Sequence, residues 1–166
     1  PYPATAYLKG FLNTKGITSY QSDLGIEVTL AIFSKQGLIN IFSAIPSGGL
    51  LSDNAIRITA LKEHYIRTID RVMLFLQGKN PTLAHLIAAR DFLPEAGRFQ
   101  QLDDLAWAFG SMGVQDKAKH IATMYLEDLS DLLQECIDEH FGFSRYAEKL
   151  GRSANSFDGL YEALQQ

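Results

Sequence analysis

Four histidines are the side chains best suited to bind a metal, but their spacing fits no common metal site. A ferritin-like di-metal bundle places a glutamate three residues before each ligand histidine. The residues at those four positions are Leu61, Thr82, Lys117 and Ile137. The H-E-x-x-H spacing of zinc proteases does not occur either. We therefore expect His64 and His85 to lie on partly exposed helix faces, and His140 to lie near a helix C-terminus, where the helix dipole favours a cation.

The sequence also lacks the signatures of nucleotide cradles and of activated nucleophiles. It contains no G-x-x-x-x-G-K-[ST] phosphate loop, no G-x-G-x-x-G turn and no G-x-S-x-G elbow. Its one cysteine, Cys136, can form no disulfide within the chain and offers a metal at most one thiolate. We interpret Cys136 as a packed core thiol. A stand-alone enzyme is the least favoured interpretation, because no nucleophile–base pair or metal set can be assembled.

Three polar stretches could contact an anion or a carboxylate. Residues 46–49 could form a backbone nest, although a flexible connector is the favoured interpretation. Arg90-Asp91 and Arg98 flank a turn that contains proline and glycine, where a surface ion pair or a loop anchor is expected. Residues 151–156 combine one cation with small hydrogen-bonding side chains, which also suits an ordinary turn between helices.

Composition and charge set further bounds. The chain has 166 residues, of which 46% are hydrophobic and 20% charged, so one globular domain is expected. A formal charge of -4, with dispersed lysines and arginines, argues against nucleic acid as a partner. No apolar run is long enough to span a bilayer, and we expect a cytoplasmic protein. Because the sequence starts without Met, we interpret it as a fragment of a longer chain.

The longest helical period predicts a core helix over residues 115–141. Its apolar residues recur in steps of three and four, so they share one face. The opposite face, which we interpret as solvated, carries Glu127, Asp128, Asp131, Glu135, Asp138 and Glu139. A second long helix is predicted over residues 53–77, after a Ser-Asp-Asn cap and before Gly78.

Shorter elements are expected around these two helices. Helices are predicted over residues 5–15, over 25–45 as a pair with a break near Gln36-Gly37, and over 83–93, 102–109, 143–150 and 156–164. Residues 17–22 could form a brief strand. The fold class is therefore mostly α: a compact multi-helix domain over residues 1–166 with two long core helices, and at most one or two short strands near the N-terminus.

The first 24 residues carry a family resemblance. Pro1-Tyr2-Pro3 is followed by Ala6-Tyr7-Leu8, Leu12 and Gly16 in the pattern A-Y-L-x-x-x-L-x-x-x-G, and then by Asp23-Leu24. This stretch resembles the start of the N-terminal, cobalamin-binding-like region of one class of radical S-adenosylmethionine enzymes. Later segments, from residues 107–110 through 143–146 to 151–153, also look like the helical region of iron–sulfur oxidoreductase-like members of that class.

The sequence departs from that family at its cofactor motifs. The cluster motif Cys-x-x-x-Cys-x-x-Cys cannot exist in a chain with one cysteine, so S-adenosylmethionine and a 4Fe-4S cluster are implied for the parent protein alone. The cobalamin motif D-x-H-x-x-G is absent, and residues 138–142 come nearest with the glycine one position early. This departure argues against cobalamin binding. We therefore expect no cofactor and no metal in this segment.

The resemblance implies a non-catalytic accessory domain that caps or shapes the substrate site of a downstream catalytic barrel. By that analogy Tyr7, Gln21 and Asp23 lie nearest the substrate, although a core aromatic role for Tyr7 and a turn role for Asp23 are the favoured alternatives. The partner would be the catalytic domain of the same chain. The competing interpretation is a helical protein-interaction module with no catalytic role. In either case an apolar patch could also support a homo-oligomer.

Overall fold

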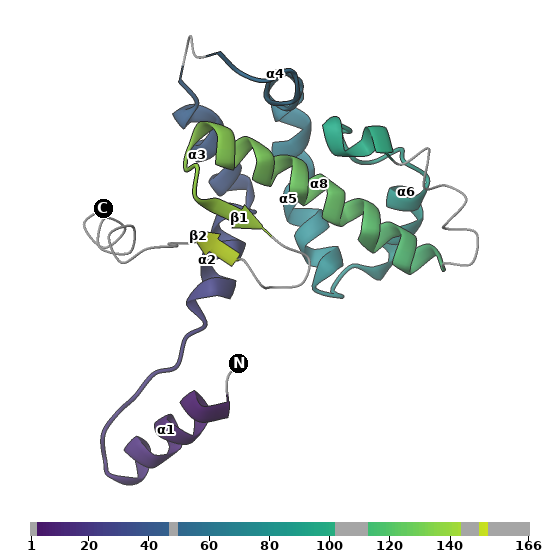
Figure 1. Ribbon diagram of the computed structural model, residues 1–166. Coiled ribbons are helices and arrows are strands. Elements are labelled where there is room, and N and C mark those ends of the chain that lie inside the picture. Colours follow the sequence, from purple (N-terminus) through teal and green to yellow (C-terminus); the bar gives the residue numbers. More distant parts are fainter. Residues whose placement is uncertain (1–2, 47–49, 102–112, 144–149, 153–166) are drawn as a thin grey trace.

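The computed structural model describes residues 3–46, 50–101, 113–143 and 150–152, and over these residues the protein is mostly α (Figure 1). The α-helices are α1 (Pro3–Thr14), α2 (Leu24–Ile32), α3 (Lys35–Ala44), α4 (Asp53–Ala60), α5 (Lys62–Leu76), α6 (Ala84–Ala88) and α8 (Val114–Cys136). Two 3₁₀ helices, η1 (Pro81–Leu83) and η2 (Gly97–Gln101), and two strands, β1 (Phe141–Phe143) and β2 (Leu150–Arg152), complete the described elements.

Helix α8 is the element against which the body of the protein packs. Helices α4, α5 and α6, together with η2 and β1, all contact it (Figure 1). Its buried face includes Ala118, Ile121, Ala122, Tyr125, Leu129, Leu132 and Leu133, in steps of three and four. The prediction of a central core helix is therefore confirmed, and Cys136 lies half-buried at its last turn.

The predicted end of this helix at Phe141 is wrong, because α8 ends at Cys136. The amide of Asp138 bonds back to the carbonyl of Leu133, and the Oδ1 atom of Asp138 accepts a 3.0 Å hydrogen bond from the amide of His140. Such local side-chain bonds compete with helix continuation. The chain then leaves as β1, so Gly142 lies in a strand and not at a helix stop.

The predicted helix over residues 53–77 is two helices. Leu61, with φ −93° and ψ 7°, separates α4 from α5, and no side chain caps the start of α5. Neither glycine nor proline marks this break in the sequence. Both helices bury an apolar face in the common core, including Ala55 and Ile58 of α4.

The expected pair of helices over residues 25–45 is confirmed, but the break lies at Phe33-Ser34 and not near Gln36-Gly37. Ser34 takes an extended conformation, and its Oγ atom accepts a 3.0 Å hydrogen bond from the amide of Gly37. Ser34 is therefore the N-cap of α3. Phe33 is buried at this corner, where its ring meets the ring of Phe143 edge-on at 5.4 Å.

Strands occur near the other end of the chain from the one expected. Residues 17–22 are extended but form no strand, because the described residues supply no neighbouring strand to pair with them. The described strands β1 and β2 pair antiparallel, with Phe141 opposite Arg152 and Phe143 opposite Leu150. Phe143 and Leu150 are therefore not helical, which contradicts a helix over the whole of 143–150.

The helix predicted over residues 83–93 ends early, at Ala88. The amide of Arg90 bonds to the carbonyl of Ile87, and Arg90 then takes a left-handed conformation with φ 65°. That conformation ends a helix in the way a glycine usually does. The helices predicted over residues 102–109 and 156–164 lie outside the described residues.

Candidate functional site

The N-terminal arm, which we define as α1 and residues 15–23, extends away from the body of the protein (Figure 1). Gly16 ends α1 with φ 73°, where the amide of Ile17 bonds to Leu12 O and that of Gly16 bonds to Asn13 O. These two bonds form a Schellman motif, so the predicted glycine stop of the first helix is confirmed. The chain then runs back along α1.

The two limbs of the arm are joined by side-chain hydrogen bonds. The hydroxyl of Ser19 donates to Lys9 O at 3.3 Å, and the side-chain amide of Gln21 donates to Thr5 Oγ1 at 2.6 Å. A groove of about 330 Å³ lies between the limbs. Its apolar lining comes mainly from Leu8, Leu12 and Tyr20. The arm thus has a built surface of its own.

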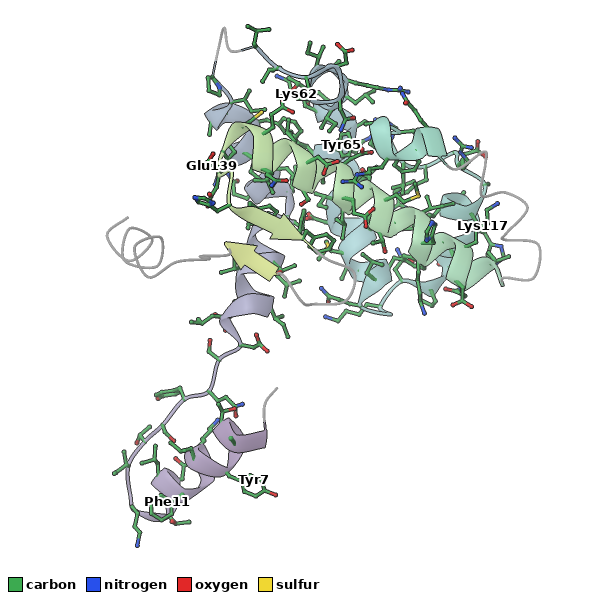
Figure 2. All side chains as sticks on the ribbon, in the orientation of Figure 1. Tyr7, Phe11, Lys62, Tyr65, Lys117 and Glu139 are labelled. Carbon is green, nitrogen blue, oxygen red and sulfur yellow. The ribbon has the colours of Figure 1, made fainter. Side chains whose placement is uncertain are left out.

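The three substrate-proximal residues expected from the sequence all lie on or beside this arm, but not in one cleft. Gln21 lines the groove. Tyr7 is 80% exposed and, with Phe11, projects outward from α1 (Figure 2). Asp23 is the N-cap of α2, and its carboxylate accepts a 3.2 Å hydrogen bond from the amide of Ile26. These contacts fit the turn role that was expected as the alternative for Asp23.

Large apolar side chains are concentrated on the surface of the arm and of α2. Each of the following is at least 41% exposed: Tyr7, Leu8, Phe11, Ile17, Tyr20, Leu24, Ile26, Val28 and Leu30. They follow one another within the first thirty residues. Isolated exposed apolar residues are ordinary, so it is the number of them on the arm and α2 that distinguishes this part of the described chain.

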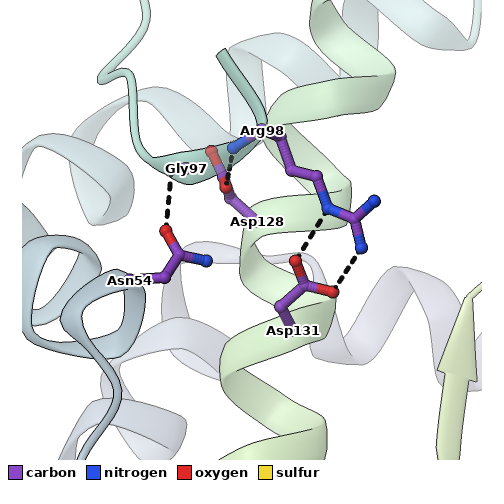
Figure 3. A network of polar contacts seen from close by, with 5 residues as sticks. All are labelled: Asn54, Gly97, Arg98, Asp128 and Asp131. Atoms are coloured by element: carbon purple, nitrogen blue, oxygen red, sulfur yellow. Dashed lines mark hydrogen bonds and ion pairs between the residues drawn. The ribbon is translucent and has the colours of Figure 1, made fainter. Parts of the chain in front are cut away.

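A second cluster of functional groups holds the start of η2 against α8 (Figure 3). The carboxylate of Asp128 accepts a 3.0 Å hydrogen bond from the amide of Arg98. The guanidinium of Arg98 forms a two-pronged ion pair with Asp131, with distances of 2.7 and 2.8 Å. Asn54 of α4 accepts a 2.7 Å hydrogen bond from the amide of Gly97. The loop anchor expected at Arg98 is confirmed, and its partners come from two helices.

Asp128 is the residue of this cluster with an unusual environment. It is fully buried, and the hydroxyl of Tyr65 donates to its other oxygen at 3.4 Å. Burial raises the pKa of Asp128 to about 6, partly offset by the hydrogen bonds from the Arg98 and Ala96 amides. Burial and the nearby Asp128 in turn raise the pKa of Tyr65. The prediction that Asp128 lies on a solvated acidic face is wrong.

Two more acids of this face have partners in other elements, although Asp131 stays partly exposed and Glu135 exposed as predicted. Asp131 is engaged by Arg98, and Glu135 accepts hydrogen bonds from the amide and the hydroxyl of Ser52 at 2.7 and 2.6 Å. These carboxylates connect α8 to the start of α4 and to η2. Both partners precede them in the chain by more than thirty positions, so spacing within the helix could not reveal them.

A small polar cleft of about 190 Å³ lies next to this cluster. Its lining includes Arg57, Arg90, Glu95 and Gln100. Arg90 forms a two-pronged ion pair with Glu95 at 2.6 and 2.7 Å, which confirms the ion pair expected at this turn, although Asp91 is the acid adjacent in sequence. Glu95 neutralises Arg90, which lowers the attraction of this cleft for an anion.

The histidines and carboxylates of the described residues do not gather into a metal site. No group of three or more His, Cys, Asp or Glu side chains there is placed to hold a metal ion. His64 lies against the carbonyl of Phe92 at 3.1 Å, and His140 lies in the turn after α8. Among the described helices, none combines the length and the apolar run that spanning a bilayer requires. Residues 47–49 and 153–156, which belong to two of the possible anion-contacting stretches, lie outside the described part.

Comparison of the chain with protein-family models, with curated proteins and with solved structures found no match. The resemblance to radical S-adenosylmethionine enzymes therefore stays a prediction.

Proposed function

We propose that this chain is a non-catalytic docking module that binds a folded protein through its N-terminal arm. The observation that carries the proposal is the run of exposed apolar side chains on α1 and on residues 17–22. The polar cluster at Asp128 is committed to holding the body together, and each of its groups already has a partner within the chain. Within the described part of the chain, the arm is therefore the surface that we assign to an interaction.

Burial of this surface would supply free energy comparable to the cost of association. Full burial of a large apolar side chain is worth roughly 1.5–3 kcal/mol. Tyr7, Leu8, Phe11, Ile17 and Tyr20 are each more than half exposed in the isolated chain. Their combined burial would yield on the order of 5–10 kcal/mol, against an association cost of similar size. A preformed, internally hydrogen-bonded arm lowers that cost because less chain must be ordered on binding.

The resemblance suggests which protein the partner is. The N-terminal residues that carry it, from Ala6-Tyr7-Leu8 to Asp23-Leu24, fall on the arm and on the first residue of α2. On that basis the partner is the catalytic barrel of a radical S-adenosylmethionine iron–sulfur oxidoreductase that includes this segment. The arm would then help shape the mouth of the substrate site. A protein partner of another kind is the alternative.

The test places a photo-crosslinking amino acid at Tyr20, which is 90% exposed, in the natural full-length protein expressed in its own host. A matched control places it at Lys117, on the far part of α8 (Figure 2). We expect a discrete crosslinked product from position 20 and none from position 117. Peptide sequencing of the product then distinguishes a cysteine-rich barrel from another protein. Equal products from both positions, or none from either, would overturn the proposal.

A further inference from the structure

Helix α2 has the composition of a buried helix, yet none of its residues is buried among the described elements. Its nine residues, LGIEVTLAI, contain one charged side chain, Glu27, and one other polar side chain, Thr29. A helix that is apolar on all sides normally lies inside a protein core or an interface. Four large apolar side chains of α2 are 41–70% exposed: Leu24, Ile26, Val28 and Leu30. Helix α2 is therefore a second uncovered apolar surface, next to the arm.

The two uncovered surfaces carry opposite charges. Residues 3–22, which make up nearly all of the arm, contain Lys9 and Lys15 and no acidic residue. Residues 23–32, which cap and form α2, contain Asp23 and Glu27 and no basic residue. Both Lys15 and Glu27 are exposed. A basic apolar surface and an acidic apolar surface are complementary, which favours contact between an arm and an α2.

The arrangement of the arm favours such a contact between two copies of the chain. The arm extends away from the body, so it does not lie over its own α2 (Figure 1). The hydrogen bonds from Ser19 and Gln21 fix the returning limb along α1, and this limb leads directly into α2. A second copy can bring its arm to this α2 and receive the first arm in return. A two-fold axis makes that exchange reciprocal, because both copies offer the same two surfaces.

The dimensions of the two surfaces are those of a stable dimer. Helix α1 has 12 residues and is about 18 Å long, enough to span the 9 residues and about 14 Å of α2. The apolar side chains of the arm and α2 that are at least 41% exposed offer together on the order of 1,000 Å², at roughly 150–200 Å² for each one when fully exposed. A standard interface buries about 800 Å² on each partner. The exchange of both surfaces thus supplies the area that a stable dimer needs.

We propose that the free chain forms a symmetric dimer in which the arm of each copy covers α2 of the other. This inference rests on the proposed function in one respect, namely that the arm is a docking surface. It adds a regulation of that surface, because an arm that lies on a second copy cannot hold another protein. The dimer must then open before the arm docks elsewhere.

Sedimentation velocity of the 166-residue chain under reducing conditions tests the dimer with two charge reversals, Lys15→Glu on the arm and Glu27→Lys on α2. We expect the native chain to be a dimer at about 100 μM, since interfaces of this size have dissociation constants of about 1 μM or lower. Each reversal places like charges together in both symmetric contacts and should weaken the dimer by about tenfold or more. The controls Lys117→Glu and Glu139→Lys change the net charge equally, on α8 and in the turn after it, and should leave the dimer as it is.

A mixture of the two variants identifies the surfaces in contact. In a mixed dimer, one contact joins a native arm to a native α2, and the other joins the two reversed charges. An equimolar mixture of Lys15→Glu and Glu27→Lys should therefore dimerise as the native chain does, which also shows that both variants are folded. A monomeric native chain, single variants that dimerise as well as the native chain, or a mixture that stays monomeric would each overturn the proposal.

The crosslinking experiment at Tyr20 separates this inference from the proposed function. A crosslinked product with another protein, together with a monomeric chain, would end the dimer and leave the docking function intact. A dimer without such a product would do the reverse. Where both occur, Glu27→Lys releases the arm without altering it, and should raise the yield of the product with the other protein about twofold or more. An unchanged yield would show that the dimer does not regulate the arm.

Discussion

At the scale of single residues, Asp128 is the group whose chemistry the fold changes most. It is fully buried and connects the Arg98 amide with the hydroxyl of Tyr65. Its neighbour one helical turn on, Asp131, makes the shorter ion pair but remains partly exposed. The two carboxylates therefore differ in what they contribute to stability, although both lie on the same helix and contact the same arginine.

Because the pKa of Asp128 is raised in the folded protein, its contribution to the free energy of unfolding falls as pH rises. The folded protein holds this proton up to about pH 6, whereas the unfolded chain releases it near pH 3.8. Between those values the folded state binds more protons, so Asp128 lowers the free energy of unfolding by roughly 2–3 kcal/mol as pH rises from about 4 to 7. Asp128→Asn keeps an acceptor for the Arg98 amide and should remove this decline. Urea denaturation of both proteins across this pH range measures the difference.

The matched control for that experiment is Glu139→Gln, since the side chain of Glu139 is 85% exposed. It removes the same charge and should leave the pH profile as it is in the native sequence. If Asp128→Asn shows the same profile as Glu139→Gln, Asp128 titrates normally and its environment is not the one described.

Substitution by alanine should show a larger difference between Asp128 and Asp131 in their contributions to stability. Asp128→Ala leaves the Arg98 amide and the Tyr65 hydroxyl without an acceptor in the interior, and should cost about 2–4 kcal/mol of unfolding free energy. Asp131→Ala breaks a partly exposed ion pair and should cost less than about 1 kcal/mol. Chemical denaturation at neutral pH compares them. Equal costs would show that the exposed pair, and not the buried acceptor, anchors the loop.

The sequence predicts the anchor at Arg98 but not its partners. Helical periodicity places Asp128 among five other acids on one side of α8, and such a side is ordinarily solvated. Periodicity reports which residues share a face, not what covers that face. Helix η2 covers this part of α8. It comes earlier in the chain, so the contact joins segments distant in sequence and periodicity within α8 cannot predict it.

At the scale of elements, the corner between α2 and α3 depends on a glycine. A Cβ atom at Gly37 would collide with the carbonyl oxygens of Ala31 and Ile32 and would lie 2.9 Å from the carbonyl carbon of Ile32. All three are backbone atoms, so the helices would have to move apart. Gly37→Ala should therefore lower stability by roughly 1–3 kcal/mol despite its better helix propensity. The measurement is the thermal midpoint.

Gly10 provides the matched control, because it is also a glycine within a helix. A Cβ atom there meets nothing within 4 Å. Gly10→Ala should stabilise α1 by up to about 1 kcal/mol, seen as slower amide exchange in α1 with an unchanged midpoint for the body. A loss of stability in Gly10→Ala would mean that this side of α1 is packed and not open.

Sequence patterns predict the helices better than they predict the helix ends. The stop at Gly16 and the presence of two helices in residues 25–45 are correct, since glycine and capping residues act locally. The break at Leu61 and the end at Cys136 are not predicted. Neither site has a glycine or proline, and both breaks let the flanking segments turn back onto the core, which is a tertiary effect.

At the scale of the whole molecule, the arm and the body are separate in their contacts. The body packs around α8, while the polar contacts of residues 3–22 run mainly between α1 and its own returning limb. The mostly α character and the central helix follow from the sequence. The sequence does not predict that the arm stands apart from the body. An apolar helix at this place in the chain is equally consistent with packing in the core.

Removal of residues 1–22 should therefore leave the body intact. The expected thermal midpoint is within a few degrees of the full chain, since the hydrogen bonds of the arm join its own two limbs. Binding of a dye that reports exposed apolar surface should fall, because Tyr7, Phe11 and Tyr20 are gone. Differential scanning calorimetry with dye fluorescence measures both. A large fall in the midpoint would mean that the arm is part of the core.

The place of α8 in the sequence has a consequence for synthesis on the ribosome. Helices α4, α5 and α6 bury their apolar faces against α8, yet all three are made before its first residue, Val114. Until α8 has left the exit tunnel, those faces have no native cover and stay open to chaperones and to other nascent chains. The body can therefore close only after α8 has emerged, and slowing the ribosome just before the codon for Val114 should raise the fraction that aggregates.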